Sequence, residues 1–195
     1  VVKNINKSFI KDGRQLPVLS DISFSVEPGQ VAVILGKTGS GKTTLLNIIS
    51  RLDTVNSGSV VCDGRVSYTA QKDLLLPWRT VLANIYLPFE IKNSLTETHK
   101  NNINTLLAEL GLDNFKEAYP HELSGGMRQK VSLIRSLAQD NPLYIFDESL
   151  SAIDFDARLQ LIKRIRDFLV KEKKIGLIVT HNIEEAISIA DKIFV

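Results

Sequence analysis

The sequence predicts an α/β fold with a mostly parallel sheet, an antiparallel β subdomain near the N-terminus and a helical insert. Three observations carry this prediction: a glycine-rich loop directly after an apolar run at residues 31–35, alternating strand and helix patterns from residue 143 onwards, and a helical pattern in the middle of the chain. Strands that alternate with helices favour a layered core with a parallel sheet. The 195 residues suit one domain, or one domain with a subdomain, and 44% hydrophobic residues can supply its core.

The first part of the chain is predicted to be mainly β. Two β-like runs occupy residues 1–5 and 22–26, and Asp12-Gly13-Arg14 reads as a turn between them. The continuous apolar run at residues 31–35 is typical of a buried parallel strand. A plausible helix follows at residues 44–49.

The middle of the chain changes from β to helical patterns. Residues 59–62 and 66–69 look like a short hairpin around Asp63-Gly64. The pattern is helical from residue 72 to about residue 122, and Ser94-x-x-Glu97 fits a capping box. We therefore predict a helical insert here.

The last part returns to alternating elements. We predict a strand at 143–146, a helix at 155–169, a strand at 175–180 and a helix after Asn182, where Asn182-x-x-Glu185 fits a second capping box. Residues 191–195 resemble the start of another strand, and we expect the natural chain to continue beyond Val195.

A phosphate-binding loop is the first chemical motif. Its residues Gly36-Lys37-Thr38-Gly39-Ser40-Gly41-Lys42-Thr43 fit G-x-x-x-x-G-K-[ST], and Thr44 follows. The glycines allow backbone N–H groups to wrap phosphates. In such loops the lysine, here Lys42, reaches the β- and γ-phosphates and the hydroxyl, here of Thr43, binds Mg²⁺. A plain glycine-rich turn is the alternative, which the flanking strand and helix disfavour.

A second anion site is predicted at Leu123-Ser124-Gly125-Gly126-Met127-Arg128-Gln129. This run opens an apolar-periodic helix, which Ser124 can cap. Gly125 and Gly126 leave the backbone bare, so that an anion can approach several N–H groups, and the helix dipole favours its charge. Two anion sites in one small domain suggest that each completes a nucleotide pocket in another copy of the chain.

Polar groups also follow two of the predicted core strands. Asp147 and Glu148 come after the strand at 143–146, where open α/β sheets place their ligands. Burying two carboxylates together is costly unless a cation or hydrogen bonds compensate. His181 follows the strand at 175–180 in the same way, although an isolated histidine is usually structural.

Together these motifs resemble the nucleotide-binding subunit of ABC (ATP-binding cassette) transporters, and the resemblance covers nearly the whole chain. It implies a P-loop NTPase core of the RecA-like type and an enzyme that hydrolyses ATP, with ATP and Mg²⁺ as cofactors. It also implies one ABC ATPase domain over residues 1–195. Residues 1–71 and 137–195 would form the core and β subdomain, and residues 72–136 the helical insert with the signature motif.

The resemblance assigns roles to individual residues. Asp147 would hold Mg²⁺ through water, Glu148 would be the general base, and His181 would contact the γ-phosphate. Gln71 resembles the Q-loop glutamine, which touches the Mg²⁺ shell or the attacking water; a surface glutamine is the alternative. Phe9 resembles the aromatic that stacks on adenine, with a core phenylalanine as the alternative. The expected nucleotide contacts are Phe9, residues 36–44, Ser124, Gly125, Gly126, Gln129 and Asp154, the last in the D-loop Ser151-Ala152-Ile153-Asp154.

Some positions depart from the family pattern. Ser149 replaces the proline that commonly follows the catalytic glutamate, Lys37 and Thr38 replace Pro-Ser of the phosphate loop, and Ala70 replaces an aromatic residue. None of these changes removes a reacting group. Ser149 is expected to affect the rate by loosening the turn that holds Glu148.

One run after Gln71 is similar to that of nitrate, sulfonate or taurine importers, and thiamine-precursor importers share much of it. Its residues are Leu74-Leu75-Leu76-Pro77-Trp78-Arg79-Thr80-Val81. The resemblance implies a head-to-tail homodimer at the cytoplasmic face of the membrane, a separate permease and, indirectly, a solute-binding protein. The alternatives are a lipoprotein-release or macrolide-efflux type, a soluble ABC ATPase that works on DNA or the ribosome, and a binding module without catalysis. Trp78 would otherwise simply pack the insert.

The composition of the chain bears on its classes of partner and on its cysteine chemistry. The formal charge of +2 gives no argument for nucleic acid or anionic membranes. Cys62 is the single cysteine, so no intrachain disulfide can form, and a filler role is favoured over a redox role. No apolar stretch approaches membrane-spanning length.

Overall fold

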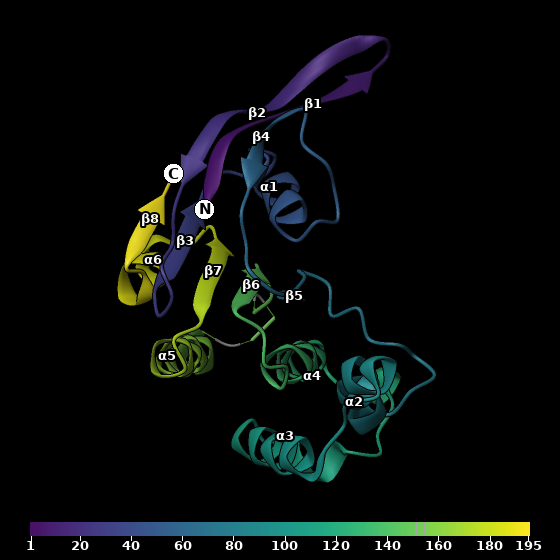
Figure 1. Ribbon diagram of the computed structural model, residues 1–195. Coiled ribbons are helices and arrows are strands. Elements are labelled where there is room, and N and C mark those ends of the chain that lie inside the picture. Colours follow the sequence, from purple (N-terminus) through teal and green to yellow (C-terminus); the bar gives the residue numbers. More distant parts are fainter. Residues whose placement is uncertain (151, 154) are drawn as a thin grey trace. The chain divides into compact units, whose positions relative to one another are not determined.

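The computed structural model describes residues 1–150, 152–153 and 155–195 (Figure 1). Two compact units share the chain. The first unit comprises residues 1–68, 141–147 and 162–195, and the second comprises residues 69–140 and 148–161. Each unit has a hydrophobic core of its own.

An antiparallel sheet of three strands opens the first unit, in the order β2-β1-β4. Strands β1 (Val2–Lys11) and β2 (Arg14–Phe24) form a hairpin that closes on the pair Lys11 and Arg14. The turn residues Asp12 and Gly13 have φ of 52° and 73°, the sign that a type I′ turn requires at both positions. The predicted turn is confirmed, but the strands extend well past residues 5 and 22. Most of that extension is exposed, so it leaves no hydrophobic pattern in the sequence.

A five-stranded sheet, in the order β5-β6-β7-β3-β8, forms the centre of the α/β fold. Strand β3 (Val31–Leu35) pairs in parallel with β7 (Ile175–Thr180) and β8 (Lys192–Phe194), and β6 (Leu143–Asp147) pairs in parallel with β7. Every residue of β6 is buried, as expected for a strand covered on both faces. The predicted α/β class with a parallel core sheet and an antiparallel β subdomain is confirmed.

The predicted hairpin at 59–62 and 66–69 is wrong. Strand β4 (Ser57–Val60) pairs with β1 in the antiparallel sheet, whereas β5 (Val66–Thr69) belongs to the five-stranded sheet. An isolated two-stranded hairpin is marginally stable, and each strand gains a longer partner in its own sheet. Strand β4 approaches β1 so closely that a Cβ on Gly58 would lie 2.3 Å from the carbonyl oxygen of Asn4.

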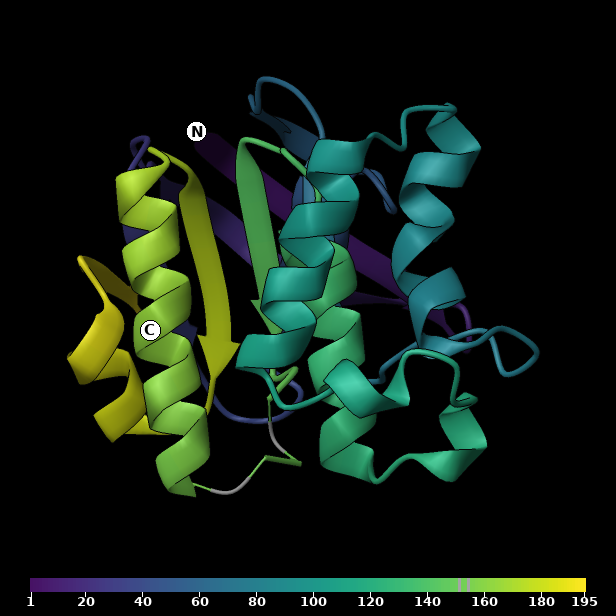
Figure 2. The same ribbon diagram turned by 90° about the horizontal axis from the view of Figure 1, so that it is seen from below.

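Helices complete the first unit. The helix α1 (Lys42–Ile49) buries Leu45, Leu46, Ile48 and Ile49. Residues 162–171 of the helix α5 (Phe155–Lys171) belong to this unit and run alongside β7 (Figure 2), and a Cβ on Gly176 of β7 would lie 2.7 Å from the Leu169 side chain. The short helix α6 (Ile183–Ile189) precedes β8, which confirms the strand predicted at residues 191–195.

The second unit is mainly helical. It holds α2 (Val81–Lys92), α3 (Glu97–Glu109), the 3₁₀ turns η1 (Asp113–Phe115) and η2 (Pro120–Glu122), and α4 (Gly125–Leu137). Its core is a cluster of buried apolar side chains that includes Val81, Ile85, Ile103, Leu107, Leu123, Val131 and Ile134. Among the residues described, no helix is both long and apolar enough to cross a membrane.

Two local predictions for the second unit are wrong. The first helix begins at Val81 and not at residue 72, because the buried amide of Asn84 accepts from Leu76 N and donates to the carbonyls of Leu76, Arg79 and Thr80. These bonds satisfy one N–H and three carbonyls of the segment without a helix. The capping box of α3 is formed by Thr96 and His99, so Ser94 does not cap it.

Candidate active site

The phosphate loop occupies the connection between β3 and α1. Gly39 and Gly41 have φ of 84° and 92°, a region that glycine adopts without the strain of a side chain. A Cβ on Gly41 would lie 3.0 Å from the carbonyl oxygen of Val18. The path of the loop therefore depends on these glycines.

The N-terminus of α1 is prepared for an anion. Its N-cap residue is Gly41, no side chain caps it, and its first turn has no acidic residue. The first amides of a helix lack internal acceptors and carry the positive end of its dipole. The ammonium group of Lys42 donates to the carbonyls of Gly36 at 2.7 Å and Lys37 at 2.9 Å, which keeps the loop curled. A triphosphate fits this cradle of amides and one cation.

Asp147 and Thr43 form a hard-oxygen pair at the end of β6. The Thr43 hydroxyl donates to Oδ2 of Asp147 at 3.3 Å, and Asp147 is only 6% exposed. Among the residues described, no three His, Cys, Asp or Glu side chains gather to hold a metal ion. One carboxylate and one hydroxyl fit Mg²⁺, which keeps waters and shares phosphate oxygens, better than a metal that needs a full protein cage.

Tyr68 is a residue that the sequence reasoning missed. Its hydroxyl, on β5, donates to the same Oδ2 of Asp147 at 3.0 Å. Burial, reinforced by the negative charge of Asp147, raises the pKa of Tyr68 above its usual value, so the phenol stays protonated and remains a donor. In the sequence, the feature that could have indicated this role is a tyrosine, an aromatic residue with a hydroxyl group, in a predicted strand of the core.

Glu148 follows Asp147 with an unusual backbone, at a φ of 46°. Non-glycine residues pay for this conformation and hold it where the surroundings fix it. Within the second unit, the amide nitrogen of Gln71 donates to Oε2 of Glu148 at 3.3 Å. The structure thus brings together two side chains that the sequence assigned separately to catalysis.

Ser149, which stands where proline is common, is 3% exposed. Its hydroxyl has no hydrogen-bond partner among the residues described. A buried hydroxyl without a partner is destabilising. Ser149 therefore places a hydroxyl without a partner among the described residues in a buried position directly after Glu148.

His181 lies directly after β7 and is exposed. The turn that carries it is fixed by a polar network: the Thr180 hydroxyl donates to Glu185 Oε2 at 2.6 Å, and the backbone N–H of Asn182 donates to the Thr180 hydroxyl at 3.0 Å. Asn182 caps α6 by accepting from the Glu185 N–H, which confirms the cap, but the predicted capping box is not completed because the Glu185 carboxylate accepts from the Thr180 hydroxyl instead. The Glu185 carboxylate is directed to Thr180, which holds the end of β7 against α6.

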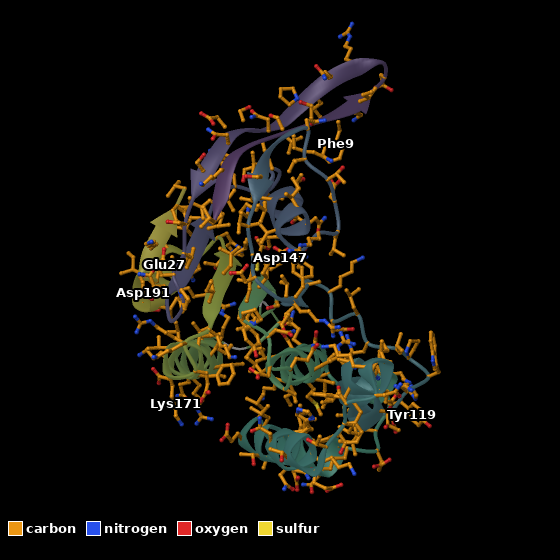
Figure 3. The ribbon with its side chains drawn as sticks, viewed as in Figure 1. Phe9, Glu27, Tyr119, Asp147, Lys171 and Asp191 are labelled. Atoms are coloured by element: carbon orange, nitrogen blue, oxygen red, sulfur yellow. The ribbon has the colours of Figure 1, made fainter. Side chains whose placement is uncertain are left out.

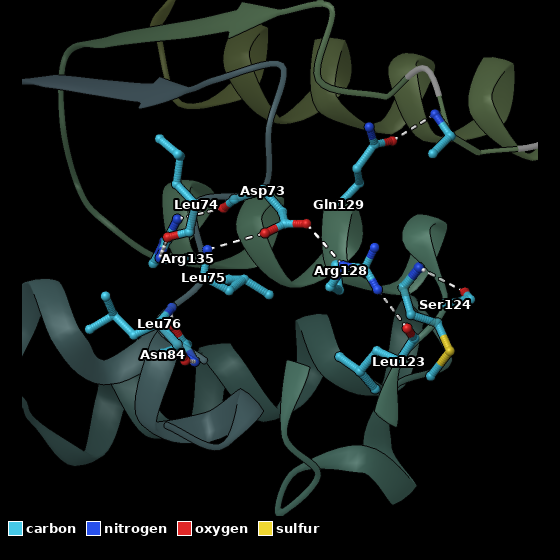
Figure 4. Close-up of polar contacts among 12 residues, drawn as sticks. Asp73, Leu74, Leu75, Leu76, Asn84, Leu123, Ser124, Arg128, Gln129 and Arg135 are labelled. Carbon is cyan, nitrogen blue, oxygen red and sulfur yellow. Dashed lines mark hydrogen bonds and ion pairs between the residues drawn. The ribbon is translucent and has the colours of Figure 1, made fainter. Parts of the chain in front are cut away.

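The predicted second anion site is the start of α4. Ser124 is exposed and caps the helix, accepting from the Met127 N–H at 3.2 Å (Figure 4), which confirms the predicted cap. A Cβ on Gly126 would lie 2.9 Å from the Ala152 carbonyl oxygen, whereas a Cβ on Gly125 would meet only ordinary contacts from 3.8 Å. Gly126 is therefore required by packing against residue 152, in addition to any ligand.

Gln129 lies one turn into α4 and is 8% exposed. Its side-chain oxygen accepts from the Ala152 N–H at 2.8 Å (Figure 4). In the structure this side chain holds the residue 152 backbone. Asp154 and Ser151, the other expected D-loop residues, lie outside the residues described.

The segment after Gln71 is tied to α4 by two arginines (Figure 4). Arg128 Nε lies 3.0 Å from Asp73 Oδ2, and Arg135 donates to the carbonyls of Asp73 at 3.0 Å and Leu74 at 3.1 Å. Burial lowers the pKa of Arg135, and the carboxylate of Asp73 opposes that shift. A hollow of about 410 Å³ lies beside these contacts, lined by residues that include Gln71, Asp73, Gly125 and Arg128.

Two aromatic residues are exposed where a core role was an alternative. Phe9 on β1 (Figure 3) is 41% exposed, and the Lys7 ammonium lies 4.9 Å from its ring centre. Trp78 is 71% exposed, so it does not pack the helical insert. Neither ring is buried in a core.

The first unit joins a phosphate loop to a hydroxyl–carboxylate pair that suits Mg²⁺, and the second carries a carboxylate oriented by an amide. This fold and these groups define a P-loop NTPase. The chain belongs to the ABC transporter family, whose model matches residues 19–151. It is accordingly an ATP-binding protein and an ATPase, as expected.

The relatives agree with this family. The uncharacterized ABC transporter ATP-binding protein YtlC of Bacillus subtilis is 37% identical, over 99% of this chain and 77% of that protein. The formylaminopyrimidine import ATP-binding protein ThiZ of Halalkalibacterium halodurans is 36% identical, over 92% and 73%. The aliphatic sulfonates import ATP-binding protein SsuB 2 of Agrobacterium fabrum is 37% identical, over 91% and 70%. The expected similarity to sulfonate importers is confirmed.

A solved structure has the same fold. The ATP-binding cassette MJ0796, in a dimeric post-hydrolysis state bound to ADP and Pi, superposes with a TM-score of 0.90 at 25% identity. The match covers 98% of this chain and 91% of that one.

Proposed function

We propose that this chain powers the import of a solute through a separate membrane permease, at the cytoplasmic face of the membrane. Two of the relatives named above are import ATP-binding proteins, for formylaminopyrimidine and for aliphatic sulfonates. The solute itself would contact the permease and a solute-binding protein, so the residues of this chain carry no information about it. Nitrate, sulfonate, taurine and thiamine precursors are the candidate classes.

The observation that carries the hydrolytic part is the bond between Gln71 and Glu148. In the proposed reaction Glu148 accepts a proton from the attacking water, and the Gln71 amide fixes the orientation of that carboxylate. Lys42 and the first amides of α1 hold the phosphates, and Thr43 and Asp147 hold Mg²⁺. When bound, Mg²⁺ neutralises charge that develops on the phosphates. His181 would contact the γ-phosphate.

A head-to-tail homodimer would complete the site. Each nucleotide would lie between the phosphate loop of one copy and Ser124, Gly125 and Gly126 of the other, with Phe9 stacked on the base. The exposed N-cap Ser124 of α4 supports this arrangement, as does the dimeric state of MJ0796 with ADP and Pi. ATP would then favour the closed dimer by binding it more tightly than the open form.

The exposed side chains of Leu74 and Trp78 support a permease partner. They are 61% and 71% exposed, respectively, in the segment between Gln71 and α2. Single exposed apolar side chains are common, whereas a contiguous apolar patch marks an interaction surface, and in this proposal Leu74 and Trp78 contribute to such a patch. A lipoprotein-release or macrolide-efflux system, the alternative, would use the same catalytic residues but differ at Trp78.

Co-purification from solubilised membranes tests the proposal. We expect a membrane protein with several spans to co-purify with the parent and to be lost from Trp78→Ala, while ATP hydrolysis by the purified variant is unchanged. Ile91→Ala, which removes an equally exposed side chain of α2, is the matched control. Co-purification with ribosomes or nucleic acid would contradict the transport proposal, and uptake of a labelled solute by reconstituted vesicles would distinguish import from export.

A further inference from the structure

The carboxylate of Asp147 is held by two hydroxyl groups on one oxygen. Tyr68 donates to Oδ2 at 3.0 Å, and Thr43 donates to the same atom at 3.3 Å. Asp147 is 6% exposed, so its charge receives little solvation from water. A buried carboxylate needs such donors, and their directions fix the plane of the group.

The position of Tyr68 is set by the sheet and by the core of the first unit. It lies on β5, which neighbours β6 in the sheet, and its ring packs against the core of the first unit. Its hydroxyl can reach Asp147 with few competing rotamers, because the strand fixes its backbone and the core fixes its ring. Thr43, in contrast, is exposed at the start of α1.

We propose that Tyr68 is a positioning residue of the Mg²⁺ site: its hydroxyl holds Asp147 so that the free side of the carboxylate faces the ion that Thr43 shares. This inference rests on the proposed roles of Asp147 and Thr43. In this role Tyr68 would act on the ion through the carboxylate of Asp147. Partners of this kind around metal ligands change metal affinity by about 10–100-fold when they are removed.

A purely structural role is the competing explanation. In that case the Tyr68 hydroxyl would only satisfy a buried carboxylate, and its removal would lower the free energy of unfolding without changing metal dependence. A measurement of metal affinity therefore distinguishes the two explanations, because a purely structural role would leave that affinity unchanged.

The test compares Tyr68→Phe with the parent and with Tyr86→Phe, a control that removes a hydroxyl from a half-buried tyrosine of α2. Mn²⁺ affinity is measured in the presence of a non-hydrolysable ATP analogue, and analogue affinity is measured again in EDTA. We expect Tyr68→Phe to bind Mn²⁺ about 10-fold more weakly, with unchanged analogue affinity in EDTA. Tyr86→Phe should match the parent in both measurements.

Equal Mn²⁺ affinity of Tyr68→Phe and the parent overturns the inference. The proposed metal site fails separately if the parent and Asp147→Asn bind Mn²⁺ equally. Should Tyr68→Phe not fold, 3-fluorotyrosine at position 68 keeps the hydroxyl and provides a ¹⁹F signal. That signal must shift when diamagnetic Mg²⁺ saturates the analogue complex, and an unchanged signal overturns the inference as well.

Discussion

The amide of Gln71 donates a hydrogen bond of 3.3 Å to the carboxylate of Glu148, across 77 residues of sequence. The backbone of Glu148 has a φ of 46°, and this residue directly follows the buried strand β6. A carboxylate with a fixed orientation can accept a proton from a water at one defined position. This pair makes Glu148 the first residue to test.

Glu148→Gln keeps the size of the side chain but removes its basicity. We expect ATP hydrolysis to fall by about 10²–10⁴-fold, the usual contribution of a general base. ATP binding should persist, and the variant should accumulate as an ATP-bound dimer. Phosphate release and size-exclusion chromatography with ATP measure these outcomes. Glu172→Gln, at an exposed site after α5, is the control, and equal turnover in Glu148→Gln and the parent would refute the assignment.

The two glycines at the start of α4 should respond differently to alanine. A Cβ at position 126 would lie 2.9 Å from a backbone oxygen of Ala152, whereas the nearest contact at position 125 is 3.8 Å. Because overpacking against backbone costs about 1–3 kcal/mol, Gly126→Ala should lower the Tm of the isolated protomer. Gly125→Ala should leave it unchanged or slightly higher.

Both alanine variants should weaken the ATP-dependent dimer, because each narrows the approach of a phosphate to the helix amides. Thermal unfolding without nucleotide and dimerisation with ATP separate the two effects. An equal loss of Tm in the two variants would show that packing on residue 152 does not distinguish them.

Ser149→Ala should not destabilise the protein. Its buried hydroxyl lacks a partner among the described residues, so its removal relieves a desolvation cost. We expect the free energy of unfolding to rise by up to about 1 kcal/mol. Ser67→Ala is the matched control: Ser67 is also buried, but it accepts a bond of 2.8 Å from the Asn141 side chain, and its removal deprives that N–H of its acceptor. Denaturant titration of both variants checks this contrast, which a loss of stability in Ser149→Ala would contradict.

The ion pair of Lys7 and Asp53 should make stability depend on acid. Lys7 Nζ lies 2.7 Å from Asp53 Oδ1, and this hydrogen bond lowers the pKa of Asp53 below its usual 3.8. When folding lowers the pKa of a carboxyl group, its charged form stabilises the folded state at pH values above the pKa of the unfolded state. This stabilisation is lost as the pH falls through the pKa of the folded state. Asp53→Asn should therefore be less stable than the parent at neutral pH, and the difference should shrink below about pH 4.

Denaturant titrations between pH 7 and pH 3 measure that difference, with Asp63→Asn as a control at an exposed carboxylate. A difference that stays constant across this range would mean that Asp53 acts through packing and not through its charge.

The sequence by itself determined what depends on near neighbours in the chain. Buried apolar runs defined β3, β6 and β7, the glycine pattern defined the phosphate loop, and Ser124 defined the start of α4. These features are decided within a few residues, by side-chain burial, backbone freedom and capping.

Only the tertiary structure decided which distant groups meet. Strands β4 and β5 read as one hairpin but belong to different sheets, because strand pairing depends on partners far away in sequence. In the same way Tyr68 meets Asp147 across 79 residues, and Gln129 meets Ala152 across 23. A hydrogen bond needs two groups at a defined distance, and one local pattern specifies only one of them.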